Sequence, residues 1–229
     1  LGRHEEALAL QKKILTKRRK DLGKEHPCTL TSMNNLASTY SSLSHHEEAL
    51  ALYKEMFEKK RNIMGEEHPD TLTAMDNLAS TYSALGRHDE ALPLYEEALA
   101  NRRKTLGEDQ PDTLTSMNLL ASTYSALGRH EKALLLHEET LAKRREILGE
   151  DHPDTFASMN NLASTYSALG RHEPDTLASM NHLASNFSDL GHHEEARALY
   201  EETLPKRREI LGEDHPDTLT NMNNLASTY

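Results

Sequence analysis

Residues that build β-sheets are scarce in this 229-residue sequence. Valine is absent, isoleucine occurs four times, and hydrophobic residues reach 36%. Because β-branched and aromatic side chains cover the faces of sheets, a sheet protein is excluded. The abundant residues Ala, Leu, Glu, Lys, Arg and Met are strong helix formers, so the composition predicts an all-α protein. An apolar fraction below the usual ~45–50% also favours a thin, layered array over one thick core.

Three further absences limit the possible partners and surroundings. The net charge is −11, and the lack of a basic surface disfavours nucleic acid as a partner. No apolar run reaches the roughly 18 residues of a membrane-spanning helix, so no membrane span is expected. A single cysteine, Cys28, cannot form an internal disulfide, which is typical of a reducing compartment and predicts a cytoplasmic location. The chain starts at Leu1 without methionine and stops at Tyr229 inside a helical pattern, so we expect a piece of a longer protein.

Two phrases alternate along the chain. The phrase LGRHEEAL, in variants, begins at Leu1, Leu43, Leu85 and Leu127, each start 42 residues after the last. The phrase HPDTLTSMNNLASTY, also in variants, begins at His26, His68, His152 and His215, with Gln110 in place of His in another copy. Near-identical blocks at a fixed spacing indicate a tandem array. We expect regular repeats over residues 1–169, the first of them incomplete.

The array is interrupted near residues 170–176. A copy of the first phrase opens at Leu169 and is cut short, and the next opens at Leu190, only 21 residues later. Residues 170–229 are therefore expected to continue the array after a 21-residue deletion and to be incomplete at the C-terminus. We expect residues 177–190 to run antiparallel to residues 156–169 and to take the place of the missing helix.

Each unit is predicted to contain two helices, near residues 30–43 and 46–64 in the first complete copy. The first follows His-Pro-Asp, where Pro suits the first helical position and Asp suits the positive end of the helix dipole. Its apolar residues recur at spacings of three and four, which predicts one buried stripe of Met33, Leu36, Ala37 and Tyr40. Glycine in the LGR turn is expected to end it in a left-handed conformation. The second helix ends in basic residues, as the negative end of the dipole favours.

The residues of these helices resemble the tetratricopeptide (TPR) family. Leu36, Ala37 and Tyr40, then Ala49 and Tyr53, stand at the offsets of the signature L-G-x2-Y followed by A-x3-F. The 42-residue period and the sequence motif HPDTLTSMNNLA are similar to those of arrays of the kinesin light chain type, and to those of arrays in some NTPase sensor proteins. The resemblance implies an α-solenoid, a right-handed superhelix of antiparallel helix pairs, that binds proteins and is not an enzyme.

In this family the first helix of each unit lines a concave groove. Residue-by-residue transfer places amide, carboxylate and hydroxyl side chains in it: Thr31, Asn34, Ser38, Thr73, Asp76, Ser80, Thr115, Asn118, Ser122, Asn160 and Ser164. Asparagine can bond both the N–H and the C=O of an extended peptide, so we predict a peptide or protein segment as partner. The competing interpretation is that these are simply solvated polar faces. The groove as transferred carries no Lys or Arg, which argues against a clamp for a peptide C-terminus.

Other functions are disfavoured by the repetition itself. The fourteen histidines recur a whole unit apart, too far for neighbours to share a zinc ion, and no nucleotide-binding or nucleophile motif is present. No metal, cofactor or catalytic residue is therefore expected. Basic clusters would align as a ridge along one edge, explained by dipole compensation and ion pairs with nearby glutamates. Two alternatives stay open: a sensor or oligomerisation region of a larger NTPase of immune type, and self-assembly through matching repeat faces.

Three local expectations complete the sequence analysis. Pro205 should kink or break its helix near residues 203–205, with a smaller effect at Pro93. Leu141, Ile147 and Leu148 should be less covered because a helix is missing. Both ends of the chain, residues 1–22 and 216–229, should fray because each lacks a neighbouring helix.

Overall fold

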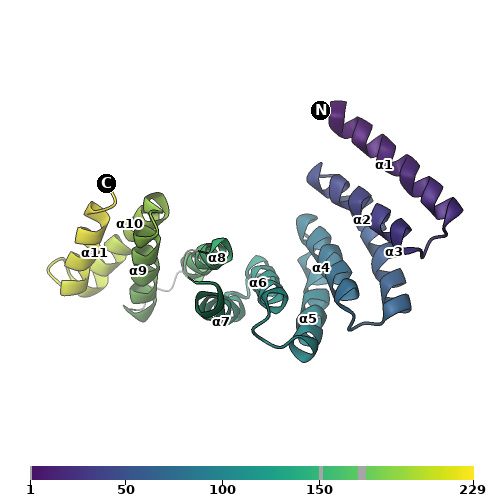
Figure 1. The fold of residues 1–229 in the computed structure, drawn as a ribbon. Helices are drawn as coiled ribbons and strands as arrows, with labels where there is room; N and C mark the ends of the chain where they lie inside the picture. Colours follow the sequence, from purple (N-terminus) through teal and green to yellow (C-terminus); the bar gives the residue numbers. More distant parts are fainter. Residues whose placement is uncertain (1, 150–151, 170–173) are drawn as a thin grey trace. The chain divides into compact units, whose positions relative to one another are not determined.

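The computed structural model describes residues 2–149, 152–169 and 174–229, with side chains from residue 5 and, after the last gap, from residue 177. Residues 171–173, which we expected to connect two first-type helices, lie outside the described residues. In the described ranges the secondary structure consists of eleven helices and no strand, which confirms the all-α prediction (Figure 1). They are α1 (Gly2–Asp21), α2 (Pro27–Ser42), α3 (His46–Met64), α4 (Pro69–Ala84), α5 (His88–Thr105), α6 (Pro111–Ala126), α7 (His130–Leu148), α8 (Pro153–Leu169), α9 (Pro174–Asp189), α10 (His193–Leu211) and α11 (Pro216–Ala226).

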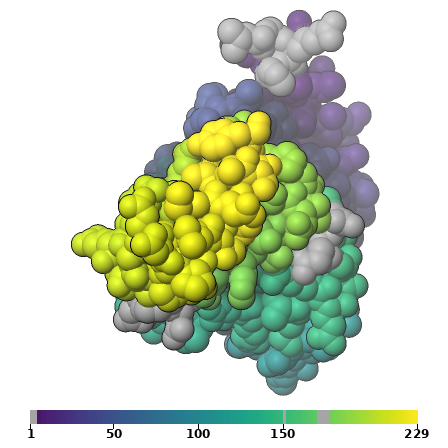
Figure 2. All heavy atoms as spheres, turned by 90° about the vertical axis from the view of Figure 1, so that its left-hand side faces the viewer, coloured from purple at the N-terminus to yellow at the C-terminus, as the bar shows by residue number. Residues whose placement is uncertain are grey.

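The helices form two compact units. The first, Leu1–Leu127, contains α1 to α6, and the second, Gly128–Tyr229, contains α7 to α11. Within the first unit each helix packs on the next one in the chain. The second unit ends with α10 and α11 packed against each other (yellow-green and yellow in Figure 2). Each helix pair joins a helix of the HPDT phrase to one of the HEEA phrase.

The histidine of the HPDT phrase caps the first helix of a unit. His26 Nδ1 accepts the backbone N–H of Cys28 at 3.1 Å, ahead of Pro27 at the start of α2. The same bond occurs at the starts of α4, α8 and α11. There the Nδ1 atoms of His68, His152 and His215 accept the backbone N–H of Asp70, Asp154 and Asp217. These bonds satisfy an N–H that the start of a helix leaves unpaired. The turn histidines of this phrase are structural caps.

The turn between the helices of a pair needs a left-handed residue. Gly86 and Gly128 have φ of 72° and 71°, as the sequence predicted. In the copy that lacks glycine, Ser44 takes the position with φ 61°, the one non-glycine residue with positive φ in the described part of the chain. Since a Cβ is disfavoured there by roughly 1–2 kcal/mol, this turn carries a local cost.

The predicted apolar stripe is buried. Met33, Leu36, Ala37 and Tyr40 are at most 8% exposed, and the equivalent residues of α4 and α6 are buried to the same degree. These stripes pack against the Ala-x3-Tyr face of the second helices, where Ala49 and Tyr53 are also buried. The core is therefore a thin layer repeated from helix to helix, as the low apolar content predicted.

One basic residue at the end of each second helix ties it to the next first helix. Arg18 Nη1 donates to Cys28 O at 2.9 Å, and Lys60 Nζ donates to Asp70 O at 3.2 Å. Arg144 and Arg207 make the same bond to the carbonyls of Asp154 and Asp217, at 2.9 and 3.0 Å. Arg102, Arg144 and Arg207 are 4–5% exposed, so at this position of the basic clusters the arginine is buried. The carbonyl of the next helix's first turn is what draws these side chains inward.

The junction after the deletion follows the expected direction but not the expected packing. The Phe156 ring, near the start of α8, meets the Phe187 ring near the end of α9 at 5.3 Å, edge to face. Tyr166, late in α8, shares a hollow with Ser179, early in α9. The two helices are therefore antiparallel, as predicted. Their backbones approach closely at few positions, however, whereas α9 packs along α10.

Helix α9 consequently does not take the place of the missing helix, and that expectation is wrong. It keeps the stripe of a first helix and uses it against α10. The expected loss of cover is also wrong for Leu141, which is 4% exposed like Leu99 one unit earlier. Ile147 is 44% exposed, close to the 48% of its counterpart Ile63, and Leu148 is half-buried. Residues of α9 join the cluster around Leu141 and supply the cover.

The two internal prolines do not interrupt their helices. Helix α10 is continuous through Pro205, and α5 is continuous through Pro93, so the expected break near residues 203–205 is wrong, while a kink there stays a prediction. Thr203 is fully buried beside it, donates to Leu199 O at 2.8 Å, and accepts from Asn221 Nδ2 of α11 at 2.6 Å. Packing on α9 and α11 holds the helix together where its own ladder loses a donor.

Candidate functional site

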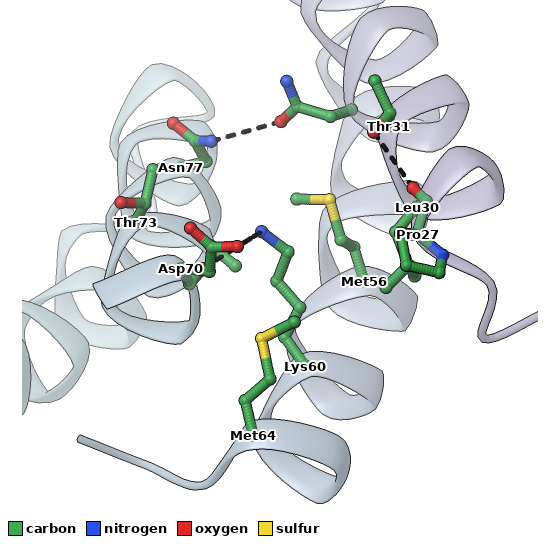
Figure 3. Close-up of a pocket in the computed structure, with 11 residues that line it drawn as sticks. Pro27, Leu30, Thr31, Met56, Lys60, Met64, Asp70, Thr73 and Asn77 are labelled. Carbon is green, nitrogen blue, oxygen red and sulfur yellow. Dashed lines mark hydrogen bonds and ion pairs between the residues drawn. The ribbon is translucent and has the colours of Figure 1, made fainter. Parts of the chain in front are cut away.

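A hollow of about 250 Å³ lies between α2 and α4, with α3 behind it (Figure 3). Both flanking helices are first helices, so this is the face that the sequence predicted as a groove. The lining residues come from all three helices: Pro27, Leu30, Thr31, Asn34, Met56, Lys60, Met64, Asp70, Thr73, Ala74 and Asn77. Three predicted site residues, Thr31, Asn34 and Thr73, are among them.

The floor of this hollow is apolar. Met56 is 1% exposed, and Leu30 and Ala74 are 4% and 1% exposed. Met64 stands at the edge with 37% of its surface exposed. Methionine adapts its shape readily because its chain is unbranched and its sulfur polarizable. The floor can therefore adapt to apolar side chains of different shapes.

The rim of the hollow is polar. Asn77 Nδ2 donates to Asn34 Oδ1 at 3.4 Å, so two amides face each other across the two first helices (Figure 3). Thr31 and Thr73 donate to the carbonyls of Pro27 and Pro69, each at 3.0 Å, one helical turn earlier. Since those hydroxyl protons are engaged, the oxygens offer lone pairs outward. The rim presents both donors and acceptors to a ligand.

A lysine also reaches the rim, which sequence reasoning missed. Lys60 of α3 lies beside Asp70, with its ammonium 3.2 Å from the backbone oxygen and 3.9 Å from the carboxylate (Figure 3). The prediction that the groove carries no Lys or Arg considered only the first helices and is wrong here. The available signal was the basic residue that recurs at the end of each second helix.

We call two neighbouring first helices, with the second helix that packs on both, a step of the array. The α4–α6 step is arranged differently from the α2–α4 step just described. Arg102 of α5 donates through Nη1 to the Asp76 carboxylate and to Ser116 Oγ. Arg102 is 5% exposed, and the side chain of Asp76 is 15% exposed. Burial raises the pKa of the Asp76 carboxyl, and the Arg102 guanidinium opposes that shift. Asp76, predicted as an open groove residue, is instead tied to Arg102.

The remaining predicted residues are spread over other first helices. The seven hydroxyl residues of the predicted set are exposed, and its Asn and Asp residues are half-buried. Ser80 and Ser122 line a smaller hollow of about 170 Å³ between α4, α5 and α6. Asn160 and Ser164 lie on α8 of the second unit, where Asn160 Nδ2 donates to Phe156 O at 3.3 Å. The structure thus brings together Thr31, Asn34 and Thr73, and leaves the others outside this hollow.

Other kinds of site are not found in the described residues. No three His, Cys, Asp or Glu side chains within the described ranges gather in a way that could hold a metal ion. Of the helices in the described ranges, none has the length and apolar character to cross a membrane.

Comparison with known proteins identifies the repeat. Two family models match, both for the tetratricopeptide repeat, one over residues 1–62, 57–104 and 70–146 and the other over residues 176–217. A solved Podosopora anserina structure of kinesin light chain type, with nearly identical TPR-like repeats, has a TM-score of 0.71 at 25% identity and covers 89% of this chain and 96% of its own. A second structure with the same description, marked as a variant with one residue exchanged, has a TM-score of 0.67 at 29% identity and covers 91% of this chain and 88% of its own.

A more distant structure shares the fold. A Rap protein complexed with Competence and Sporulation Factor has a TM-score of 0.55 at 16% identity, covering 99% of this chain and 61% of its own. No curated protein matches the chain. The family models cover more than half of the residues. The chain belongs to the tetratricopeptide repeat family, as an array of the kinesin light chain type.

Proposed function

We propose that the first unit binds an extended segment of a partner peptide or protein in the hollow between α2 and α4, and that it catalyses no reaction. Arrays of this family are interaction scaffolds whose stacked helices offer long binding surfaces. The observation that carries the proposal is the amide pair of Asn34 and Asn77 above an apolar floor. This combination suits a peptide, since it offers partners to the backbone and a place for a side chain.

The amide pair is a weak contact that a ligand can replace. The bond from Asn77 to Asn34 is 3.4 Å long, well beyond the usual 2.9–3.0 Å. An extended peptide offers an N–H and a C=O in each residue, and an asparagine can bond both. Displacing one long bond by two shorter ones favours binding without requiring the helices to move.

The apolar floor adds affinity that the amides alone would lack. Met56 and Leu30 line it but are only 1% and 4% exposed, so Met64 at its edge, 37% exposed, supplies the apolar surface that a ligand can cover. Covering such a surface with an aliphatic side chain is worth roughly 25 cal/mol for each Å² removed from water. Backbone bonds set the direction of the peptide, and this contact selects a residue with an apolar side chain. The solved Rap protein complex is a case in which an array of this fold holds a bound factor.

A blocked peptide, acetyl-Gly-Ser-Leu-Ser-Gly-amide, tests the proposal. We expect its titration at millimolar concentration to shift the side-chain amide NMR signals of Asn34 and Asn77 in a saturable manner. The matched control, acetyl-Gly-Ser-Gly-Ser-Gly-amide, lacks the apolar side chain and should shift them at least fivefold more weakly. If neither peptide shifts these two signals more than the other asparagine signals, the proposal is wrong.

A variant of the protein provides a second control. Leucine stands at position 119, the place equivalent to Asn77 one unit later, so Asn77→Leu has a precedent in this chain. The variant should keep its helical content and lose most of the peptide affinity. Unchanged affinity would show that the amide pair does not hold the peptide.

A further inference from the structure

The two steps of the first unit differ in a linked set of residues. Positions 42 apart are equivalent, and three of them change together between the α2–α4 step and the α4–α6 step: Asn34 to Asp76, Lys60 to Arg102, and Ala74 to Ser116. A fourth equivalent position changes from Met56 to Ala98. These are the residues that meet where a second helix faces the two first helices.

In the α4–α6 step these residues form one bridge. Arg102 reaches from α5 to a carboxylate on α4 and a hydroxyl on α6, through Asp76 and Ser116. A guanidinium carries five donors in a plane and can serve two acceptors at once. Ala98, fully buried one turn earlier in α5, has no side chain long enough to enter this space. The arginine therefore fills the place between the first helices.

In the α2–α4 step the same bridge cannot form. Asn34 offers a neutral amide where Asp76 offers a carboxylate, and Ala74 has no acceptor where Ser116 has one. Lys60 accordingly bonds only Asp70, at the start of α4. The space that Arg102 fills is left as the hollow over Met56. One set of four residues thus leaves this place between the first helices open, and the other fills it; the smaller hollow beside Ser80 and Ser122 is lined by other residues of the α4–α6 step.

A third step, in the second unit, also has an arginine at this position, with backbone carbonyls as its acceptors. Arg207 of α10 stands at the position of Arg102 and is 4% exposed. It donates to Leu177 O of α9 at 3.0 Å and to Asp217 O of α11 at 3.0 Å. Here too an arginine spans two first helices. In this step Asn181, the counterpart of Asn34, is only 8% exposed and is therefore not open to a ligand.

We propose that the residue at the position of Lys60 decides which steps of the array bind a ligand: lysine leaves a step open, and arginine with its acceptors closes it. The α2–α4 step is then the ligand-binding step of the first unit, although its neighbour has nearly the same sequence. This inference rests on the proposed function, because it names the residues that limit the same site to one step.

Two sets of exchanges test the inference, each copying a combination that already exists in this chain. The closing set is Asn34→Asp, Met56→Ala, Lys60→Arg and Ala74→Ser. The opening set is Asp76→Asn, Ala98→Met, Arg102→Lys, Ser116→Ala and Leu119→Asn. Because both combinations occur one 42-residue repeat away, we expect both proteins to fold, and circular dichroism with thermal melting checks this. The probe is acetyl-Gly-Ser-Leu-Ser-Gly-amide, followed by NMR.

The expected results differ for the two sets. The closing set should weaken binding more than tenfold, and the opening set should raise the stoichiometry from one peptide to two, with a saturable shift of the amide introduced at position 76. If the natural protein binds at Asn34 and Asn77 but the closing set binds equally well, or the opening set gains no second site, the inference is wrong.

Crystal structures of the two sets separate this inference from the proposed function. If the natural protein does not bind the peptide, the proposed function falls, and the structures alone judge the inference. The closing set must then show the guanidinium at position 60 in contact with positions 34 and 74, and the opening set must show a hollow over position 98. Absence of either feature overturns it.

Discussion

The segments α2–α3–α4 and α8–α9–α10 use the same two phrases and reach different packings. In the first, α3 lies between two first helices and packs on both. In the second, the missing 21 residues bring two first helices together, and α9 turns antiparallel to α8 while packing mainly on α10. The core nevertheless continues across the junction, through Met159 and Leu162 of α8 to Met180 and Phe187 of α9. An array of this kind tolerates loss of a helix because each stripe can pack on another stripe.

Restoring the missing helix should change the junction most. Residues 132–152 are the 21 residues that stand between the equivalent flanks one unit earlier, and a copy of them inserted between Glu173 and Pro174 returns the 42-residue period. We expect the free energy of unfolding to rise by a net amount on the order of 3 kcal/mol, since the added helix buries several apolar side chains and costs ordering entropy. Urea denaturation measures the change. A protein of equal or lower stability would show that α9 already packs as well as a second helix.

Helix α7 also differs from α3, α5 and α10 at one core position. His137 stands where Tyr53, Tyr95 and Tyr200 stand, is 1% exposed, and its Nδ1 has no hydrogen-bond partner. Burial lowers its pKa from 6.5 to about 4. Protonation is therefore disfavoured in the folded state, and stability is retained above pH 6.5 and lost as the pH falls toward 4.

At pH 4 we expect the buried His137 to reduce the free energy of unfolding by about 3 kcal/mol at most, which follows from the size of its pKa shift. Thermal melting between pH 7 and pH 4 measures it in the natural protein. The variant His137→Tyr copies the residue of the other units and should remove this part of the pH dependence. An identical pH profile in the two proteins would contradict the assignment.

The ring contact at the junction makes a smaller contribution. Leucine occupies the positions equivalent to Phe156 in α2, α4 and α6, so Phe156→Leu returns the regular residue. We expect a loss of about 1 kcal/mol, because the edge-to-face contact with Phe187 disappears. Urea denaturation compares it with Leu72→Met, a similar change of shape inside the regular part. A loss no greater than in that control would show that the ring contact adds nothing beyond burial.

An effect of similar size is expected at the turn between α2 and α3. Ser44 has φ 61° where the equivalent residues Gly86 and Gly128 have φ near 71°. Ser44→Gly should raise stability by about 1 kcal/mol, since the left-handed conformation suits glycine. The reverse exchange Gly86→Ser should cost a similar amount, and thermal melting checks both. Equal stability of all three proteins would mean that the turns relax without cost.

Much of the fold could be predicted from the sequence. The His-Pro-Asp phrase starts the first helices, glycine ends them, and the spacing of Met33, Leu36 and Tyr40 marks the buried stripe. The bounds expected for the second helix, residues 46–64, agree with α3. These features are predictable because each depends on residues within about one helical turn of one another.

The candidate site was predictable only in part. Thr31, Asn34 and Thr73 line the hollow as the repeat pattern suggested, but Asp76 is tied to Arg102 and Lys60 joins the rim. The transferred set treated all units alike and used only first helices. Whether a step is open depends on side chains of three different helices, which no single phrase contains.

The sequence by itself determined the period, the helices and their buried faces, since these follow from local capping and spacing. Tertiary structure decided three other matters: which partner Arg102 finds 26 residues away, that α9 packs on α10, and that α10 continues through Pro205. The physical reason is the same in each case. A buried charge takes the nearest acceptor, an apolar stripe packs on the nearest stripe, and neighbouring helices support a ladder that lacks one bond.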